Sequence, residues 1–370
     1  MTRNRPLDQK DVEILGALDK LGGKTSTEDL SKATGIPART VRYRLQKMRD
    51  ASILSPSRTY THERKMGMGE AIILIHTTPG SNEILEKMFR KIRSIYFWSS
   101  TYGRYNGYIL YCLYSVATPS VPRRLAEAFQ KEGLISNFYL FDVTDYEHKH
   151  GDFKHLDPKQ GWCYDWKIWH KKIKKNLKSK TTKINTKCEA NPSILEFDTA
   201  DYEILRSLYD NAMIPQKDLA KKFSLSETQV TKKIRRMHDA GVIKGYSADF
   251  HAAGVMLHFI LFIEIEEPVP RIINNFHAHP FLGSLMMESR TRWGIRMGLP
   301  AEDIYGFLQG LELMEPYLKF AAFQVLYRFT RSPPNTHPYD LFNKEAHKWE
   351  TPISDYLDII SNVMTESKSE

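Results

Sequence analysis

Apolar residues follow a helical period in two stretches of the chain, residues 8–60 and 198–250. Each stretch predicts two short amphipathic helices and then a third helix, whose apolar residues recur at positions i, i+4 and i+7. These apolar positions are Val41, Leu45 and Met48 in the first stretch and Val230, Ile234 and Met237 in the second. The paired positions are 189 residues apart, which indicates a duplicated set of domains rather than a solenoid of short repeats.

After each third helix, residues 51–54 and 240–243 predict a turn and a short strand, which we interpret as the wing of a winged helix-turn-helix domain. The pattern then changes to strands and helices in the order βαββαβ, over residues 69–146 and again over 256–330. The predicted elements are strand 70–77, helix 81–93, strand 96–102, strand 107–117, helix 120–132 and strand 136–144, and then strand 257–266, helix 269–277, strand 283–290, strand 293–298, helix 301–315 and strand 319–328. The predicted fold class is therefore α+β, with two winged helix-turn-helix domains alternating with two ferredoxin-like βαββαβ domains.

Two segments lie outside these four domains. Residues 147–195 predict a linker that is aromatic at first and then rich in lysine, with no acidic residue between Lys167 and Lys187. We expect its tryptophans to pack on the first αβ domain. Its lysines are interpreted either as a solvated linker or as added affinity for phosphates. Residues 331–370 predict a C-terminal extension with a polar tail.

The charge of the third helices favours double-stranded DNA as a partner. The chain has a formal net charge of +9 and a pI near 9.2. A basic helix that follows a capped helix and a tight turn is the arrangement by which helix-turn-helix proteins enter the major groove. The positions predicted to contact DNA are Arg39, Thr40, Arg42, Tyr43, Arg44 and Lys47 in the first copy and Glu227, Thr228, Gln229, Thr231, Lys232, Lys233, Arg235 and Arg236 in the second.

Bases are expected to be read from the first two turns of each third helix. The aligned residues are Ala38, Arg39, Arg42 and Tyr43 in the first copy and Glu227, Thr228, Thr231 and Lys232 in the second. Because the two sets share almost no chemistry, the preferred DNA site is expected to be asymmetric. Alternatively, one copy reads bases while the other mostly holds phosphates.

Residues 226–247 resemble the recognition helix and wing of the Lrp/AsnC (leucine-responsive, feast/famine) family of transcription regulators. The matching residues are Val230, Ile234, Met237, Gly241, Val242, Ile243, Gly245 and Tyr246. Members of that family usually carry one domain pair per chain and dimerise by pairing their αβ domains sheet to sheet. The resemblance therefore implies that the two αβ domains pair within this single chain, and it leaves a further homodimer open.

The same resemblance implies a small-molecule effector, which the family binds at the turn between the second and third strands of the αβ domain. In the first domain the matching turn contains Gly103, Tyr105 and Asn106, where the neutral Asn106 replaces a carboxylate that would pair with a ligand ammonium group. In the second domain the turn departs from the family pattern. Its Arg290 and Arg292, beside Trp293, would suit an anionic ligand, or the turn is a plain hairpin.

Cysteines and histidines predict no metal and no other cofactor. Cys112, Cys163 and Cys188 are too widely spaced for a zinc ribbon or a disulfide framework. Residues 148–155 and residues 277–279 have His-x-His spacing, but neither group lies near cysteines at metal-ligand spacing and the two groups do not correspond in the duplication, so we interpret them as parts of surface loops and helix ends. The N-terminus is polar and no apolar run is long enough to span a bilayer, so a cytoplasmic protein with no membrane partner is expected.

Two alternatives to sequence-specific regulation remain open at this point. An architectural chromatin protein with weak sequence preference would also explain the positive charge. Siroheme decarboxylases resemble Lrp/AsnC proteins and can occur fused, but they carry a His-Asn-Tyr-like motif in the second strand of the αβ domain. Residues 95–100 and 285–288 do not match that motif. With no other catalytic motif in the chain, we expect a protein that is not an enzyme.

Overall fold

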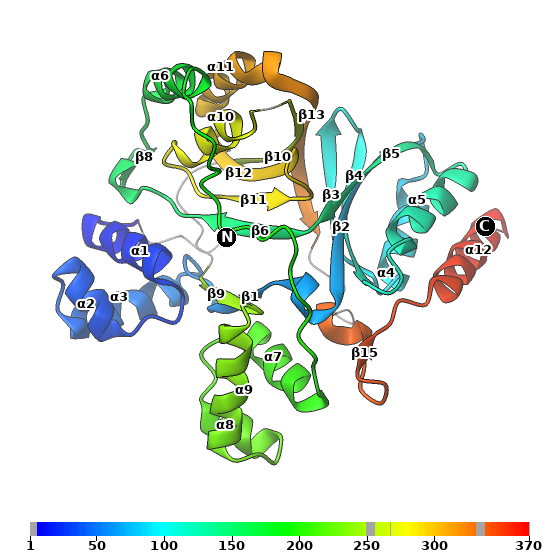
Figure 1. The fold of residues 1–370 in the computed structure, drawn as a ribbon, viewed down its shortest axis with the longest axis horizontal. Helices are drawn as coiled ribbons and strands as arrows, with labels where there is room; N and C mark the ends of the chain where they lie inside the picture. Colours follow the sequence, from blue (N-terminus) through cyan, green and yellow to red (C-terminus); the bar gives the residue numbers. More distant parts are fainter. Residues whose placement is uncertain (1–5, 249–255, 267, 331–336, 370) are drawn as a thin grey trace.

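The computed structural model describes residues 6–248, 256–266, 268–330 and 337–369. The polar N-terminal residues 1–5, the predicted domain end at residue 250 and the predicted start of the C-terminal extension at residue 331 lie outside these ranges. The chain forms two helical domains, which lie below and to the left of a central sheet in Figure 1, and helices cover the outer surfaces of that sheet. This arrangement confirms the predicted α+β class.

Each helical domain contains the three predicted helices, followed by one strand. In the first domain these are α1 (Gln9–Leu21), α2 (Thr27–Thr34), α3 (Ala38–Asp50) and β1 (Arg58–Thr61). In the second they are α7 (Thr199–Asp210), α8 (Gln216–Lys222), α9 (Glu227–Asp239) and β9 (Ile243–Ser247). Capping boxes at Asp8 and Asp198 begin α1 and α7, because each aspartate accepts the backbone N–H three residues on.

The strand predicted at residues 51–54 lies later, at residues 58–61, and the strand predicted at residues 240–243 begins at Ile243. Strand β1 pairs with β9 antiparallel, from Arg58 opposite Ser247 to Thr61 opposite Ile243. A lone strand has no sheet partner for its backbone N–H and C=O groups, and the strand of the other copy supplies one along one edge. The two helical domains are therefore joined to each other by a two-stranded sheet.

Both αβ domains show the predicted βαββαβ order. The first consists of β2 (Met68–Thr77), α4 (Asn82–Lys91), β3 (Ile95–Gly103), β4 (Gly107–Ser115), α5 (Val121–Lys131) and β5 (Ile135–Val143). The second consists of β10 (Met256–Ile265), α10 (Pro270–Ile273), β11 (Gly283–Met287), β12 (Arg292–Pro300), α11 (Ile304–Met314) and β13 (Leu318–Thr330). The helix predicted over 269–277 is one α-turn that continues as a 3-10 turn, Asn274–His277.

The two αβ domains combine into one nine-stranded sheet, in the order β5-β2-β4-β3-β13-β10-β12-β11-β6. Strand β13 pairs with β10 along its first part and with β3 along its last part. The unpredicted strand β6 (Asp145–Lys149) follows β5 after one residue and pairs with β11. The two edge strands of the sheet, β5 and β6, are therefore consecutive in the chain. Side chains on the inner surfaces of the two halves of the sheet pack on each other, with the rings of Phe141 and Phe262 4.9 Å apart.

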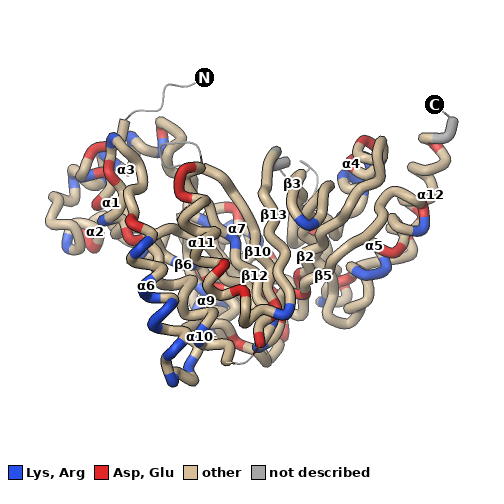
Figure 2. Tube along the Cα trace, turned by 90° about the horizontal axis from the view of Figure 1, so that it is seen from above, with Lys and Arg blue, Asp and Glu red and all other residues tan. Residues whose placement is uncertain are grey.

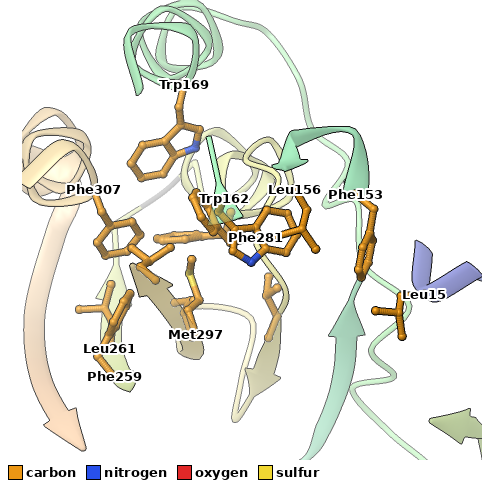
Figure 3. Packing of buried hydrophobic residues seen from close by; sticks show 14 of the residues in the cluster. Leu15, Phe153, Leu156, Trp162, Trp169, Phe259, Leu261, Phe281, Met297 and Phe307 are labelled. Atoms are coloured by element: carbon orange, nitrogen blue, oxygen red, sulfur yellow. The ribbon is translucent and has the colours of Figure 1, made fainter. Parts of the chain in front are cut away.

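The segment after the first αβ domain packs on the second, so the prediction that its tryptophans cover the first domain was wrong. It forms a hairpin of β7 (Leu156–Asp157) and β8 (Gly161–Trp162), and then α6 (Trp166–Leu177). The indole of Trp169 stacks on Phe307 of α11, with centroids 5.5 Å apart. Figure 3 shows this aromatic layer, in which Trp162, Phe281 and Phe307 continue the same core.

The C-terminal segment mirrors this arrangement on the first αβ domain. It forms a hairpin of β14 (Phe342–Asn343) and β15 (Lys348–Trp349), followed by α12 (Ile353–Ser369) instead of the predicted polar tail. Helix α12 lies against α4 and α5, as Figure 1 shows, and buries Tyr356, Ile360 and Val363 in the core of that domain. Each segment thus crosses from the end of one αβ domain to the other αβ domain.

Each hairpin also holds one helical domain. Phe153, just before β7, packs with Leu15 of α1 in the same hydrophobic core as Trp162 (Figure 3). Phe342 of β14 stacks on Tyr202 of α7, with ring centroids 4.4 Å apart and planes inclined by 13°. The helical domains are therefore not tethered by loose linkers but share continuous cores with the rest of the molecule.

Candidate nucleic-acid interface

Helix α3 has one buried face and one basic face. Val41, Leu45 and Met48 are buried among the first three helices, while the side chains on the opposite side face solvent. Tyr43 is 61% exposed, and the ammonium group of Lys47 lies 5.6 Å from its ring centroid. Exposed residues on this face are Arg39, Arg42, Tyr43, Lys47 and Arg49, and Thr40 is half-buried.

Helix α9 also has one buried face and one exposed face, and its exposed face is less basic than that of α3. Its N-terminus is fixed by a capping box in which Ser226 accepts from the N–H of Gln229. Thr231 donates to Gln216 of α8 at 2.6 Å, and in the first copy the aligned Arg42 reaches Glu28 of α2 at 3.3 Å. Exposed residues on this face are Glu227, Thr228, Gln229, Thr231, Lys232, Arg235 and Arg236.

Two predicted DNA contacts are instead committed to the protein. The Arg44 guanidinium lies 2.7 Å from Asp8 and 2.9 Å from the buried carboxylate of Asp11. At the aligned position, the Lys233 ammonium group lies 2.5 Å from Asp198 and 3.2 Å from the buried Asp201. Asp201 also accepts from Arg236 at 3.3 Å. The third helix of each copy is therefore bound to the first turn of its first helix by ion pairs.

The junction between the helical domains and the sheet contains a buried polar cluster that the sequence did not reveal. Asp145 of β6 pairs with Lys244 of β9 at 2.5 Å and lies 3.5 Å from the ring of His62. Burial lowers the pKa of His62 to about 4, with Lys244 acting in the same direction and Asp145 opposing it. Lys65 donates to the carbonyl of Ala240 at 2.9 Å. These contacts fix the paired strands β1 and β9 against the large sheet.

The predicted effector turn in the first αβ domain is held by a strand of the second. The backbone N–H of Tyr105 donates to Gln324 of β13 at 2.9 Å, and the N–H of Gly103 donates to Asn106 at 3.1 Å. Tyr105 is buried in the hydrophobic cluster between the two halves of the nine-stranded sheet. Of the three predicted residues only Asn106 lines a cavity of about 440 Å³, whose wall also includes His76, Glu83, Glu86, Tyr102 and Tyr327.

In the second αβ domain the predicted arginines do not form an open anion site. Arg292 pairs with Glu288, lies 4.0 Å from Glu264 and donates to the hydroxyl of Tyr139 at 3.0 Å. The carbonyl of Arg290 accepts from the indole N–H of Trp293 at 2.8 Å. The charge of Arg292 is thus already balanced by carboxylates, which argues against the anionic ligand expected there.

The two histidine groups, which are far apart in the sequence, lie at one cavity of about 280 Å³. His150 and His155 come from the segment after β6, and His277 and His279 from the turn before β11. Across the described ranges of the chain, no three histidine, cysteine, aspartate or glutamate side chains are grouped so as to hold a metal ion. The ring of His279 is buried beside Trp166 and Trp169, and burial holds its pKa well below the usual range.

Among the described residues, no helix combines the length and the apolar composition that a bilayer-spanning segment needs.

Comparison with known proteins identifies the helical domains. The family model for winged helix-turn-helix DNA-binding domains matches residues 7–54 and 197–244. The proline dehydrogenase transcriptional activator of Rhodobacter capsulatus is 38% identical over 68 residues, which cover 18% of this chain and 44% of the activator. The leucine-responsive regulatory protein of Rhizobium meliloti (strain 1021) is 32% identical over 68 residues, with coverage of 18% and 44%. The chain thus spans less than half the length of these relatives.

One solved structure is similar in fold along almost the whole chain. The crystal structure of the siroheme decarboxylase NirDL covers 97% of this chain and 100% of its own, with a TM-score of 0.51 and 10% sequence identity. At that identity the likeness concerns the fold alone. The helix-turn-helix matches in both copies and the curated relatives show that this chain resembles Lrp/AsnC regulators, with the winged helix-turn-helix domain present twice.

Proposed function

We propose that this chain is a transcription regulator that binds double-stranded DNA sequence-specifically through two different recognition helices, α3 and α9. The observation that carries the proposal is the exposed basic face of each helix, in domains that are fixed to each other by the pairing of β1 with β9. Cationic side chains displace counterions from phosphates, and arginine can donate two hydrogen bonds to guanine.

The two helices are proposed to read different half-sites. The first turns of α3 present Arg39, Arg42 and Tyr43, whereas the first turns of α9 present Thr228, Thr231 and Lys232. Arginine at such positions favours guanine, while threonine contacts the thymine methyl group or several bases less selectively. A bound DNA sequence is therefore expected to have one strongly specified half and one weakly specified half.

The test is a selection of purified protein against fragmented genomic DNA of the host, followed by sequencing of the retained fragments. An asymmetric motif upstream of genes supports the proposal. The double variant Arg39→Ala, Arg42→Ala should relax one half of the motif only, at a cost of about 1–3 kcal/mol for each base that the arginines no longer bind. Arg123→Ala with Arg124→Ala on the outer face of α5 is the matched control and should leave the motif unchanged.

Other results of this selection would contradict the proposal in different ways. Uniform retention that vanishes as salt rises would favour an architectural chromatin protein. No retention at all would exclude DNA binding. The fold likeness to a siroheme decarboxylase would then make tetrapyrrole binding, followed by absorbance, the next measurement.

We also propose that the 440 Å³ cavity beside Asn106 binds a small effector with a cationic group. Glu83 and Glu86 both line this cavity, and Glu86 accepts from Tyr108 at 2.9 Å. Glu83 lies 3.6 Å from Lys87 and Glu86 lies 3.5 Å from Arg90, so a ligand cation would replace these exposed pairs on the helix surface. A panel of amino acids and amines should contain a ligand that raises the melting temperature of the wild-type protein. The Glu86→Gln variant should lose that shift, and a shift that persists would place the ligand elsewhere.

A further inference from the structure

Helix α6 presents an unneutralised basic face to solvent. Trp166, Trp169 and Ile173 are buried against α10 and α11, which fixes the orientation of the helix. The other side carries exposed lysines, and Figure 2 shows them as a blue run along α6 and the chain that follows it. These residues are Lys167, Lys171, Lys172, Lys174, Lys175 and Lys178. None of the lysines between residues 167 and 187 forms an ion pair with any residue that the structure describes, in contrast to Arg44 and Lys233.

The duplicated half of the chain shows that these lysines are not needed for folding. Trp162 in β8 and Trp349 in β15 are 187 positions apart, and the same shift aligns the buried Trp169 and Ile173 with the buried Tyr356 and Ile360 of α12. The shift aligns the exposed lysines 171, 174, 175 and 178 with Asp358, Ser361, Asn362 and Thr365, which are also exposed. A helix in this position thus packs on an αβ domain without a single lysine at those sites.

The lysines of α6 also repel one another. Residues three and four apart lie side by side on a helix, so Lys171 repels Lys174 and Lys175, and Lys174 repels Lys178. Such a surface is best satisfied by a partner that carries closely spaced negative charge, and double-stranded DNA has the highest such density among the partners considered for this chain. Lysine acts on phosphate as a point charge and does not select a base.

Both views place α6 on the same side of the molecule as the first winged helix-turn-helix domain and far from α12 (Figures 1 and 2). The two are also connected through one hydrophobic core, which contains Leu15 of α1, Trp162 of β8 and Trp169 of α6. We propose that the lysine face of α6 binds the phosphate backbone of DNA that continues past the stretch contacted by α3. This inference rests on the proposed function, and it adds a flanking contact that is independent of sequence.

The test compares two duplexes that carry the selected motif: one ends at the motif, and the other is extended on both sides. The variant is Lys171→Gln, Lys174→Gln, Lys175→Gln, and binding is measured by fluorescence anisotropy over a series of salt concentrations. On the extended duplex, the slope of log K against log salt should fall by about 0.9 for each phosphate that the variant no longer neutralises. On the short duplex, the wild type and the variant should bind equally.

A matched control removes the same charge elsewhere. Arg123→Gln, Arg124→Gln, Lys131→Gln on α5 alters three exposed basic residues of a helix on the other αβ domain and should change neither slope. A second variant with arginine at the three α6 positions should retain the wild-type slope on the extended duplex. None of the altered α6 lysines has an ion-pair partner among the described residues, so the melting temperatures should not change. An unchanged melting temperature would show that a variant folds.

The ways in which the proposal can fail are distinguishable. If the wild type binds both duplexes and the α6 variant matches it on both, the flanking contact is disproved while the proposed function stands. If the wild type binds neither duplex, both proposals fall. Binding of the wild type to phosphatidylserine vesicles that the α6 variant loses, with equal binding of both proteins to the extended duplex, would assign the lysine face to membranes and overturn its assignment to DNA.

Discussion

Two buried aspartates, Asp11 and Asp201, determine which basic residues of the third helices are free for DNA. Each is completely or almost completely buried and is paired with a cation from the third helix. An unpaired carboxylate at such a site would be strongly destabilising, so Arg44 and Lys233 are required where they are. Arg39 and Arg42, three positions apart on the same helix, are exposed, and the pair that Arg42 forms with Glu28 at 3.3 Å is itself exposed.

Arg44→Ala should therefore reduce stability, whereas Arg39→Ala should reduce only DNA binding. We expect Arg44→Ala to lower the free energy of unfolding by roughly 2–3 kcal/mol, because the buried Asp11 loses its ion pair with Arg44 while Asp8 remains half exposed. Urea denaturation of both variants, together with DNA affinity, measures the difference. Equal stability of the two variants would show that the ion pairs at Asp11 contribute little.

His62 should make stability depend on pH. Because burial depresses its pKa to about 4, the unfolded chain binds a proton at higher pH than the folded chain does. The stability that this group contributes is present above about pH 6.5 and is lost as the pH falls towards 4. Between pH 7 and pH 5 the wild type should lose about 2 kcal/mol more than His62→Gln does. Parallel stability profiles of the two proteins in urea would disprove this role.

At the scale of elements, helix α11 is shaped to receive α6. A Cβ atom at Gly306 or Gly310 would overlap the indole of Trp166 or Trp169, so glycine allows the two helices to approach closely. Gly310→Ala should lower the free energy of unfolding by about 1–3 kcal/mol, even though alanine is the better helix former. Glu312→Ala, on an exposed position of α11, is the control.

A rescue experiment separates this close contact from a loss of backbone flexibility. Trp169→Leu should lower the free energy of unfolding when made alone. The double variant with Gly310→Ala should lose less free energy of unfolding than the sum of the two single losses. Strict additivity of the two substitutions would show that the glycine and the indole do not interact.

The order of elements could be predicted because each helix and strand repeats its own local period. Val41, Leu45 and Met48 mark the buried face of α3 without any knowledge of its neighbours. Strand β6 could not be predicted, because its buried face is Asp145, Glu147 and Lys149, whose burial depends on partners from distant parts of the chain. For the same reason, the pairing of β1 with β9 and the convergence of the histidines on one cavity left no local signal.

In the candidate DNA-binding site, too, the local features could be predicted and the long-range contacts could not. The sequence located both third helices and the exposed positions on them. It did not separate Arg44 and Lys233 from the other basic residues, because their partners Asp8, Asp11, Asp198 and Asp201 are more than 30 positions away. The contacts of Arg292 could not be predicted for a similar reason, since the hydroxyl of Tyr139 and the carboxylate of Glu264 belong to other strands.

At the scale of the whole molecule, the two halves are interlocked by contacts made in both directions. Strand β3 of the first half pairs with β13, β11 of the second half pairs with β6, and each hairpin segment crosses to the opposite αβ domain. A protease site inserted after Pro192, in the exposed connection before α7, would sever the covalent link alone. After cleavage the two fragments should elute from size-exclusion chromatography together.

Their separation without denaturant would contradict the interlocked arrangement. The expected result follows from the strand pairings and the shared apolar cores, which must all break before the fragments part. An uncleaved sample kept under the same conditions controls for effects of the inserted site itself.

The join between the halves also changes what a single mutation can do. In a symmetric pair of identical chains, every substitution is copied to both sides, and a change that benefits one surface must be tolerated on its twin. Here Lys174 stands on one helix while Ser361 stands on the other, and Arg42 corresponds to Thr231 in the same way. A gene that encodes both halves can therefore improve one surface without altering the other, a freedom that no assembly of identical subunits possesses.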